Sequence, residues 1–263
     1  FSEDEIVDYK DMPELERYIL HKLCLIDNEV RESYENFDLK SVFQILLNFS
    51  NLDLSSFYFD IRKDCLYCDS PKSNIRKSTR TVLDLLFDYL VRWFAPILCF
   101  TAEEVRKSRF PDLNNSIHEM QFLDVKNEWN NSELFEKWES IRSIRKVVTG
   151  AIELERKEKR IGSSLEAKPI LYISNDDYAD ALKDIDLPEI FITSQAELRN
   201  EKGPENAFTL DEIDDVAVIC NIAEGNKCSR SWKILPEVGT DIEYPDLSLR
   251  DAKVMREIND KGN

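Results

Sequence analysis

The sequence predicts a mainly helical chain: an antiparallel helical bundle over residues 1–160, followed by a small α/β domain over 161–223 and a tail over 224–263. Apolar residues recur every three or four positions through the first part, which is helix spacing. In the second part, short β-branched runs alternate with a helical segment. The tail is polar and rich in turn-forming residues. With 263 residues and 42% hydrophobic content, the chain is long enough to build such cores.

The first two helices follow from capping residues and apolar spacing. Asp11 and Pro13 are typical of a helix start. The residues after them place one apolar face along a helix: Leu15, Ile19, Leu23, Ile26 and Val30. Asp38 is predicted to cap a second helical segment that continues towards Ile61.

Two further helices and a long one complete the predicted bundle. A loop near Pro71 precedes a third helix, which Pro96 is expected to end. Thr101–Glu104 matches a capping box, so a short fourth helix is predicted there. After a polar loop over 111–131, Ser132 is predicted to cap the long helix, whose apolar stripe is Leu134, Trp138, Ile141, Ile144, Val148 and Ile152.

The spacing of apolar residues changes near Ile161, from the helical pattern to short strand-forming runs. Strands are predicted over Pro169–Ile173, Glu189–Thr193 and Val216–Cys220. A helix is expected over Asp177–Lys183, between the first two of these strands. In the tail, the only regular element predicted is a helix over residues 249–258.

The chain is strongly acidic, but its charge is unevenly distributed. A net charge of −17 excludes a nucleic-acid footprint spread over the whole chain. Residues 174–220 carry 13 acidic and 3 basic side chains, whereas residues 142–160 carry 7 basic and 3 acidic ones. A basic stretch on a rigid helix suits phosphate contacts, but a solvated face of Glu–Arg and Glu–Lys pairs has the same pattern. Charge alone favours the solvated face.

Signatures of catalysis and of nucleotide binding are missing from the sequence. The nearest two glycines, Gly150 and Gly162, lie 12 residues apart, which excludes a Walker loop and a dinucleotide fingerprint. His21 and His118 are isolated, and no nucleophile–base arrangement is supported. Cys65-x-x-Cys68 has the spacing of a redox or zinc motif. It lacks both a thioredoxin-like context and a second cysteine pair, so we interpret it as coincidental.

The cysteine content and the apolar runs predict a cytoplasmic protein. Six cysteines in 263 residues do not make a disulfide scaffold and are expected to be reduced. The longest apolar run, Trp93–Phe100, has 8 residues and is too short to cross a membrane. No leader sequence is visible and the chain begins at Phe1, so we expect it to be a fragment of a longer protein.

Three stretches together resemble one family. They are Met12–Leu20, Asn48–Tyr67 with the later Ala95–Leu98 and Phe100–Glu104, and Ile161–Ala167. In these stretches the sequence resembles the bacterial-type isoleucyl-tRNA synthetases, and the resemblance covers essentially all 263 residues. Leucyl and valyl synthetases have similar helical bundles, but the strings DLSSFYFD and GSSLEA look specific to the isoleucine family.

The resemblance implies that this region binds tRNA and carries no chemistry. The bundle would be of the class I synthetase anticodon-binding type and would hold the anticodon stem-loop of tRNA-Ile. The catalytic domain, which uses ATP and Mg, and the editing domain would lie upstream in the same monomeric enzyme, so no cofactor is expected here. The side chains expected to contact tRNA are Arg62, Lys63, Arg142, Arg145, Lys146, Arg156, Lys159, Arg160, Arg230, Trp232 and Lys233. The alternative is a helical protein-interaction scaffold without RNA binding.

The tail departs from the family pattern. The resemblance implies a zinc-binding element with two Cys-x-x-Cys pairs, but the corresponding positions here are Cys228, Ser231, Ser248 and Asp251. Zinc in such elements takes four N or S ligands, and serine hydroxyls are poor substitutes. The sequence therefore predicts a degenerate zinc knuckle without metal. Its fold would depend on a small core, expected from Trp232, Ile234, Leu235, Leu247 and Leu249.

Overall fold

A computed structural model describes residues 5–111 and 114–260 of the chain. The chain forms two compact units, one made of Phe1–Arg62 and Pro71–Phe135 and the other of Lys63–Ser70 and Glu136–Asn263. The division falls inside the long helix, about 25 residues before the predicted limit at 160. The three-part domain organisation stays a prediction.

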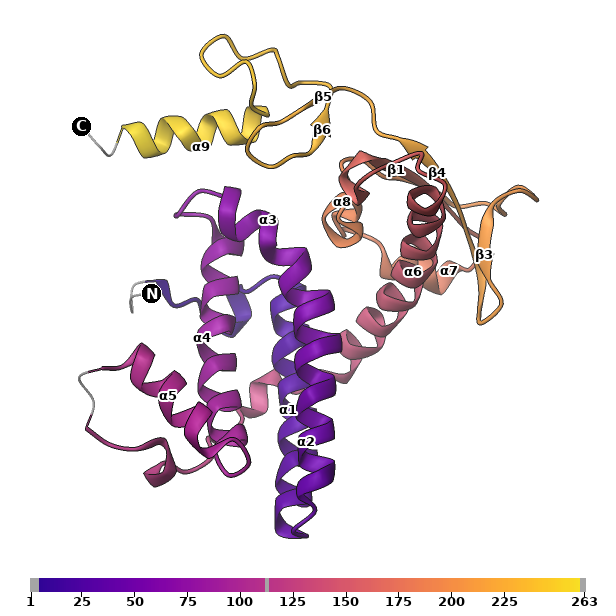
Figure 1. Cartoon of the computed structure of the whole chain (residues 1–263). Helices are drawn as coiled ribbons and strands as arrows, with labels where there is room; N and C mark the ends of the chain where they lie inside the picture. Colours follow the sequence, from indigo (N-terminus) through magenta and orange to yellow (C-terminus); the bar gives the residue numbers. More distant parts are fainter. Residues whose placement is uncertain (1–4, 112–113, 261–263) are drawn as a thin grey trace. The chain divides into compact units, whose positions relative to one another are not determined.

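The first unit is helical, as predicted. Its elements are α1 (Glu14–Glu35), α2 (Leu39–Asn48), the start of α3 (Asp60–Cys68), α4 (Asn74–Phe94), α5 (Cys99–Arg109) and the first turn of α6 (Ser132–Lys157). Figure 1 shows α1, α2 and α4 as rods lying side by side. Large side chains with almost no exposure fill the space between them, including Tyr18, Leu46, Tyr58 and Trp93.

The rod that begins with α2 changes its winding along its length. Residues Phe49–Phe59 form a π-helical segment, which continues without a break into α3. The segment buries Phe49, Asp53, Leu54, Phe57 and Tyr58. Long π-helical runs are rare, and short ones mark functional or strained positions. This segment contains most of the string DLSSFYFD.

The predicted helix caps are correct at some ends and wrong at others. The Asp38 side chain accepts a hydrogen bond from the Ser41 backbone N–H, as predicted. Asp11, however, lies in a short 3₁₀ turn, and α1 begins after Pro13. Asn131 rather than Ser132 caps α6, because its side-chain oxygen accepts from the Leu134 N–H.

The capping box predicted at Thr101–Glu104 is also wrong. Helix α5 already begins at Cys99, so Thr101 lies inside it. The residue that binds a backbone N–H is Glu103, whose carboxylate accepts from Ile117 at 2.9 Å. This contact fixes the segment after α5, where Ile117 is buried. The end of the preceding helix is correct, since α4 stops at Phe94, just before Pro96.

The second unit combines helices with a small sheet. The strands β1 (Ala167–Ile173), β2 (Glu197–Arg199), β3 (Phe208–Leu210) and β4 (Ile213–Ile222) lie in the order β2-β1-β4-β3. Strands β1 and β2 are parallel, and the other pairs are antiparallel. The central pair aligns Leu171 with Val218, and both side chains are buried. Helix α6 buries its whole predicted stripe, from Leu134 to Ile152.

One predicted strand is a helix. Residues 189–193 were expected to be extended, but most of them belong to α8 (Leu187–Phe191). Asp186 caps this helix by accepting from the Glu189 N–H, and Pro188 fits its first turn. The helix ends at Ile192, which adopts a left-handed conformation with φ 55°. These end signals outweigh the β propensity of the apolar residues between them. The neighbouring helix α7 (Asp176–Ala181) lies where a helix was predicted.

The tail contains a two-stranded ribbon, β5 (Asn226–Lys227) and β6 (Ile234–Leu235), and helix α9 (Leu249–Asn259). Helix α9 was predicted, and the ribbon was not. The tail core consists of Cys228, Val238, Leu247 and Ala252, against which Leu235, Tyr244 and Met255 pack. Leu235 and Leu247 were predicted to belong to this core. The same prediction was wrong for Trp232 and Leu249, which are exposed.

Across residues 5–111 and 114–260, every helix is too short or too polar to cross a bilayer.

Candidate nucleic-acid interface

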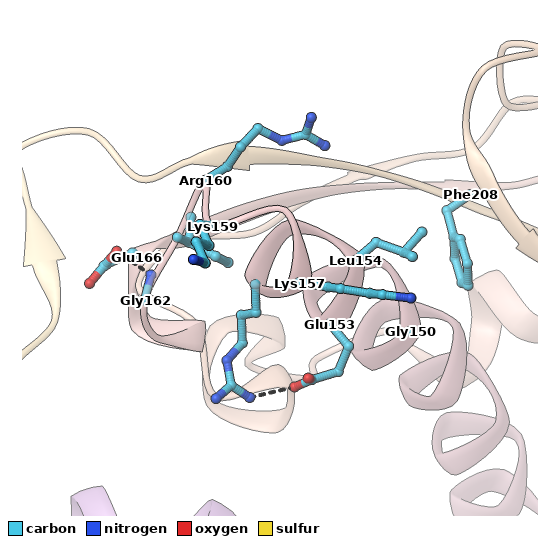
Figure 2. Close-up of a pocket in the computed structure, with 11 residues that line it drawn as sticks. Gly150, Glu153, Leu154, Lys157, Lys159, Arg160, Gly162, Glu166 and Phe208 are labelled. Atoms are coloured by element: carbon cyan, nitrogen blue, oxygen red, sulfur yellow. Dashed lines mark hydrogen bonds and ion pairs between the residues drawn. The ribbon is translucent and has the colours of Figure 1, made fainter.

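The carboxyl end of α6 borders a hollow of about 910 Å³ on the second unit (Figure 2). Helix residues and the turn after the helix form one side of it, and strand β3 contributes one side chain. The lining residues are Gly150, Glu153, Leu154, Arg156, Lys157, Lys159, Arg160, Ile161, Gly162, Glu166 and Phe208. Four of them are cations and two are carboxylates, so the hollow is locally basic on an acidic protein.

The backbone conformation at the end of α6 determines where the basic side chains of the hollow lie. The Arg160 N–H donates to the Glu155 carbonyl, and the Lys159 N–H donates to the Arg156 carbonyl, both at 3.0 Å. These two bonds make a Schellman motif, in which the residue after the helix is left-handed. That residue is Lys159, with φ 60°. Glycine usually occupies this position, because a side chain there costs about 1 kcal/mol or more.

The cations of the hollow differ in their partners. Arg156 pairs with Glu153 at 2.6 Å, and Arg160 pairs with both Glu155 and Glu158. Lys157 and Lys159 are exposed and form no ion pair with any residue that the structure describes. An anionic ligand would therefore meet two lysines whose charge is not already balanced by a neighbouring carboxylate.

The floor of the hollow is apolar. The Phe208 ring from β3 lies directly on Gly150 of α6, so closely that a Cβ at that position would be 2.7 Å from the ring. Figure 2 shows Leu154 and Lys157 beside Phe208 at this side of the hollow. This pair could not be predicted from the sequence, because the two residues are 58 positions apart and neither is unusual by itself. Lys157 was likewise not among the predicted tRNA contacts.

The three basic residues further back on α6 have different surroundings. Arg145 is half-buried and donates from its Nε to the Ile190 carbonyl of α8 at 2.9 Å. Arg142 is also half-buried, and Lys146 is exposed. Arg145 thus holds α8 against α6, which gives it a structural role irrespective of any ligand.

Arg62 lies in the core of the first unit, not on a surface. Its Nε and Nη2 atoms each lie 2.7 Å from the Glu16 carboxylate, which also accepts from Tyr58 and Thr79. Both Arg62 and Glu16 are almost completely buried. The sequence pattern did not show this, because a charged residue on a helix is normally solvated. We therefore remove Arg62 from the proposed interface, whereas its neighbour Lys63 is exposed.

The basic and aromatic residues of the tail are arranged around an exposed tryptophan. Arg230 donates to the Tyr67 carbonyl and to the Met255 sulfur, both at 3.0 Å, and Lys233 pairs with Asp64 at 3.3 Å. Trp232 is 62% exposed and has a left-handed backbone with φ 64°. The Lys227 ammonium lies 5.7 Å from the centre of its ring. Of the predicted tail contacts, Trp232 is the one that presents a large side chain to solvent.

Three of the four positions that correspond to zinc ligands lie together in the structure. Cys228, Ser248 and Asp251 meet in the tail core, and the Ser231 hydroxyl is buried without a hydrogen-bond partner among the described residues. Residues 5–111 and 114–260 contain no group of three or more His, Cys, Asp or Glu side chains suited to a metal ion.

The second cysteine of the Cys65-x-x-Cys68 motif is buried. Burial raises the pKa of the Cys68 thiol to about 11. A thiol with such a pKa is a poor redox nucleophile at neutral pH.

Comparisons with known proteins agree on one type of domain. Residues 16–171 match the family model described as the anticodon-binding domain of tRNA ligase. The chain is 50% identical over 254 residues to an isoleucine–tRNA ligase of Agrobacterium fabrum, which covers 97% of this chain and 26% of that protein. It is 48% identical over 257 residues to the isoleucine–tRNA ligases of Bartonella henselae and Bradyrhizobium diazoefficiens, covering 98% of this chain and 26% of each of them. The chain thus spans about a quarter of the length of these curated relatives.

Proposed function

Because the chain belongs to the family of anticodon-binding domains of tRNA ligases, we propose that it is the part of an isoleucine–tRNA ligase that holds the anticodon stem-loop of tRNA-Ile. The parent enzyme would join isoleucine to this tRNA with ATP and Mg, in catalytic and editing domains outside this chain. We further infer a cytoplasmic, monomeric enzyme and a bundle of the class I synthetase type. Within this chain, the proposed role is binding alone.

The observation that carries the proposal is the basic end of α6. Phosphate recognition needs cations held on a rigid element, because each neutralised phosphate releases condensed counterions. Lys157 and Lys159 meet this requirement, since both are exposed and neither is paired with a described carboxylate. Arg156 and Arg160 lie beside them and could exchange their surface ion pairs for phosphates, because such pairs are weak.

Trp232 is the proposed contact for an unpaired base. Single-stranded loops of RNA are recognised largely by stacking of bases on aromatic rings. Stacking on an exposed aromatic side chain contributes about 1–3 kcal/mol per base. Trp232 offers a ring that is 62% exposed, with the Lys227 ammonium nearby for a phosphate. The other proposed contacts are Lys63, Lys146, Arg142 and Arg145. The two lysines are exposed, and the two arginines are half-buried.

The proposal is tested by filter binding of the 263-residue chain to a tRNA-Ile transcript at several salt concentrations. Lys157→Ala and Lys159→Ala should each weaken binding and lower the salt slope by about 0.7–0.9 per lost phosphate contact. Lys40→Ala, a change of an exposed lysine on α2, is the matched control and should leave the slope unchanged. Absence of binding at low salt would favour the protein-interaction scaffold instead.

A further inference from the structure

Loop 228–233 connects β5 to β6 and carries Trp232. Backbone hydrogen bonds of Cys228, its first residue, join the start of the loop to its end. The Cys228 N–H donates to the Lys233 carbonyl at 2.8 Å, and the Cys228 carbonyl accepts from the Trp232 N–H at 3.0 Å. The conformation of this loop is strained, because a bulky residue rarely adopts the φ of 64° seen at Trp232. Such a conformation persists only where its surroundings hold it in place.

The Cys228 side chain fastens this loop to the start of α9. Its thiol lies 3.2 Å from Asp251 Oδ2 and donates to it, and its sulfur accepts from the Ser248 N–H at 3.3 Å. Ser248 Oγ donates to the same carboxylate oxygen at 2.7 Å. It also accepts from the Asp251 N–H, which caps α9. All three residues are buried, so these bonds are shielded from water.

Two guanidinium groups complete the cluster. Arg230 Nε lies 3.6 Å and Arg250 Nη2 lies 3.4 Å from Asp251 Oδ1. Arg250 also binds Asp64 of α3, with Nη1–Oδ2 and Nη2–Oδ1 distances of 2.5 and 3.0 Å. The charge of the buried Asp251 is thus balanced within the protein, which a buried carboxylate requires.

The same arrangement fits a zinc ion badly. A structural zinc takes four N or S ligands, and its cysteines bind as thiolates. Here Cys228 is hydrogen-bonded as a thiol, and the neighbouring Ser248 hydroxyl already serves as a helix cap. The nearby Cys68 thiol lies 3.9 Å from the Arg230 carbonyl in the same loop and donates to it. A dication would also stand next to two guanidinium groups and be repelled by them.

We infer that the Cys228–Ser248–Asp251 cluster organises the tail without metal. In the zinc-binding element that the resemblance implies, a metal ion would join the two ligand pairs; here the hydrogen bonds of the cluster make that connection. The cluster also fixes loop 228–233 so that Trp232 stays on the surface. The inference concerns the fold of the tail and holds whether or not this chain binds RNA.

Metal content and hydrogen exchange test the inference on the 263-residue chain. Protein purified without chelator should contain far less than one zinc per chain, and a strong zinc chelator should leave amide exchange in residues 226–235 unchanged. About one zinc per chain, or a chelator-induced rise in exchange, would overturn it.

Substitutions distinguish hydrogen bonding from metal ligation at Cys228. Cys228→Ala should raise amide exchange of loop 228–233 about tenfold or more. Cys228→Ser should keep most of the protection, because a hydroxyl can replace the thiol as donor and acceptor, whereas it would fail as a zinc ligand. Equal loss in both variants would contradict the inference.

The other half of the cluster has a matched control in the same loop. Ser248→Ala should also raise exchange there about tenfold. Ser229→Ala removes only an exposed hydrogen bond to Asp246, of 2.6 Å, and should change exchange less than twofold. If the two serine variants behaved alike, the buried cluster would have no special role in holding the loop.

Discussion

At Lys159, the backbone and the proposed ligand favour different residues. The left-handed φ of 60° is best met by glycine, yet the position carries an exposed ammonium at the edge of the basic hollow. Strain kept at a binding residue is typical of functional positions. Replacement of Lys159 by glycine should therefore raise the stability of the fold and weaken RNA binding.

We expect Lys159→Gly to raise the free energy of unfolding by about 0.5–1 kcal/mol and to weaken tRNA binding. The gain comes from relief of the left-handed strain, and the loss from removal of one cation. Lys159→Ala is the comparison, since it removes the same charge and keeps the strain. Denaturant unfolding and filter binding measure the two effects. A glycine variant that bound tRNA as tightly as the parent chain would exclude Lys159 from the interface.

His21 should make the first unit sensitive to mild acid. Its Nδ1 accepts a hydrogen bond from the Asn131 N–H at 2.9 Å, which requires a neutral ring. Burial lowers the pKa of His21 below its ordinary 6.5, and Lys22 adds to this. Because the folded pKa lies below the unfolded one, the unfolded chain binds the proton first as pH falls. Stability is therefore complete above about pH 6.5 and declines below it.

Thermal unfolding at pH 7.5 and 5.5 measures this effect. The midpoint should fall on acidification in the parent chain, and it should fall less in His21→Gln, which keeps a hydrogen-bond acceptor without a titrating ring. The second histidine, His118, is exposed and serves as a control when it is replaced by glutamine. The same acid dependence in all three proteins would rule out His21 as its source.

Among elements, the contact between α1 and α3 depends on a buried ion pair. Arg62 and Glu16 are joined by two bonds of 2.7 Å, and the carboxylate also ties in Thr79 of α4. Removal of one partner from such a pair leaves a buried charge without compensation and costs about 3–5 kcal/mol. The pair therefore fixes how three helices of the first unit meet.

Arg62→Ala should destabilise the first unit by about 3–5 kcal/mol and leave the salt slope of tRNA binding unchanged under conditions where the unit stays folded. The double variant Glu16→Gln, Arg62→Met should recover part of the loss, because it buries no unpaired charge. Chemical denaturation of the parent chain, Glu16→Gln, Arg62→Met and the double variant completes the double-mutant cycle. A lower salt slope for Arg62→Ala would return Arg62 to the interface.

Helices were predicted more accurately than strands, and the reason is physical. The α6 stripe repeats over five turns and could be predicted from spacing alone. Residues 189–193 carry β-forming side chains, but Asp186 and Pro188 at the start of α8 decide their conformation. The short strands β2, β3, β5 and β6 have two or three residues each, too few for a periodic pattern. Their positions depend on pairing with distant partners.

The candidate site could be predicted only in part for the same reason. Arg156, Lys159 and Arg160 belong to a local run of charge, and the resemblance to the synthetases makes them candidates for tRNA contact. Arg62 is buried because it pairs with Glu16, which lies 46 positions earlier in the sequence. Phe208 lies on Gly150, which lies 58 positions earlier. Such long-range contacts leave no local pattern in the sequence. In the tail, the resemblance pointed to four positions, and three of them meet in the structure, although only Cys228 among these three keeps its sulfur.

For the whole molecule, the distribution of charge matters more than its total. A net charge of −17 repels nucleic acid at long range, while the basic end of α6 offers a local site. Such a molecule is expected to bind RNA in one region and to avoid nonspecific binding elsewhere. The sequence also lacks any phosphate-binding glycine loop, which bears on catalysis.

The 263-residue chain should give no isoleucine-dependent exchange of pyrophosphate into ATP. It carries no nucleotide-binding motif and, within the described residues, no cluster suited to a metal ion. An intact isoleucine–tRNA ligase, such as that of Agrobacterium fabrum, is the positive control in the same assay. Exchange by the purified chain above the level of a heat-denatured sample would refute the binding-only role.

The π-helical segment Phe49–Phe59 constrains which insertions and deletions the chain can accept. Loss of one residue from this segment would turn every later side chain of the rod by about 100° relative to α2. Ile61 and Arg62 would then leave the core, and Glu16 would lose its partner. Loops such as residues 36–38 can change length without this effect. The spacing between Leu46 and Ile61 is therefore as much a part of the fold as the residues themselves, and homologous chains with this rod should conserve its length even where the side chains differ.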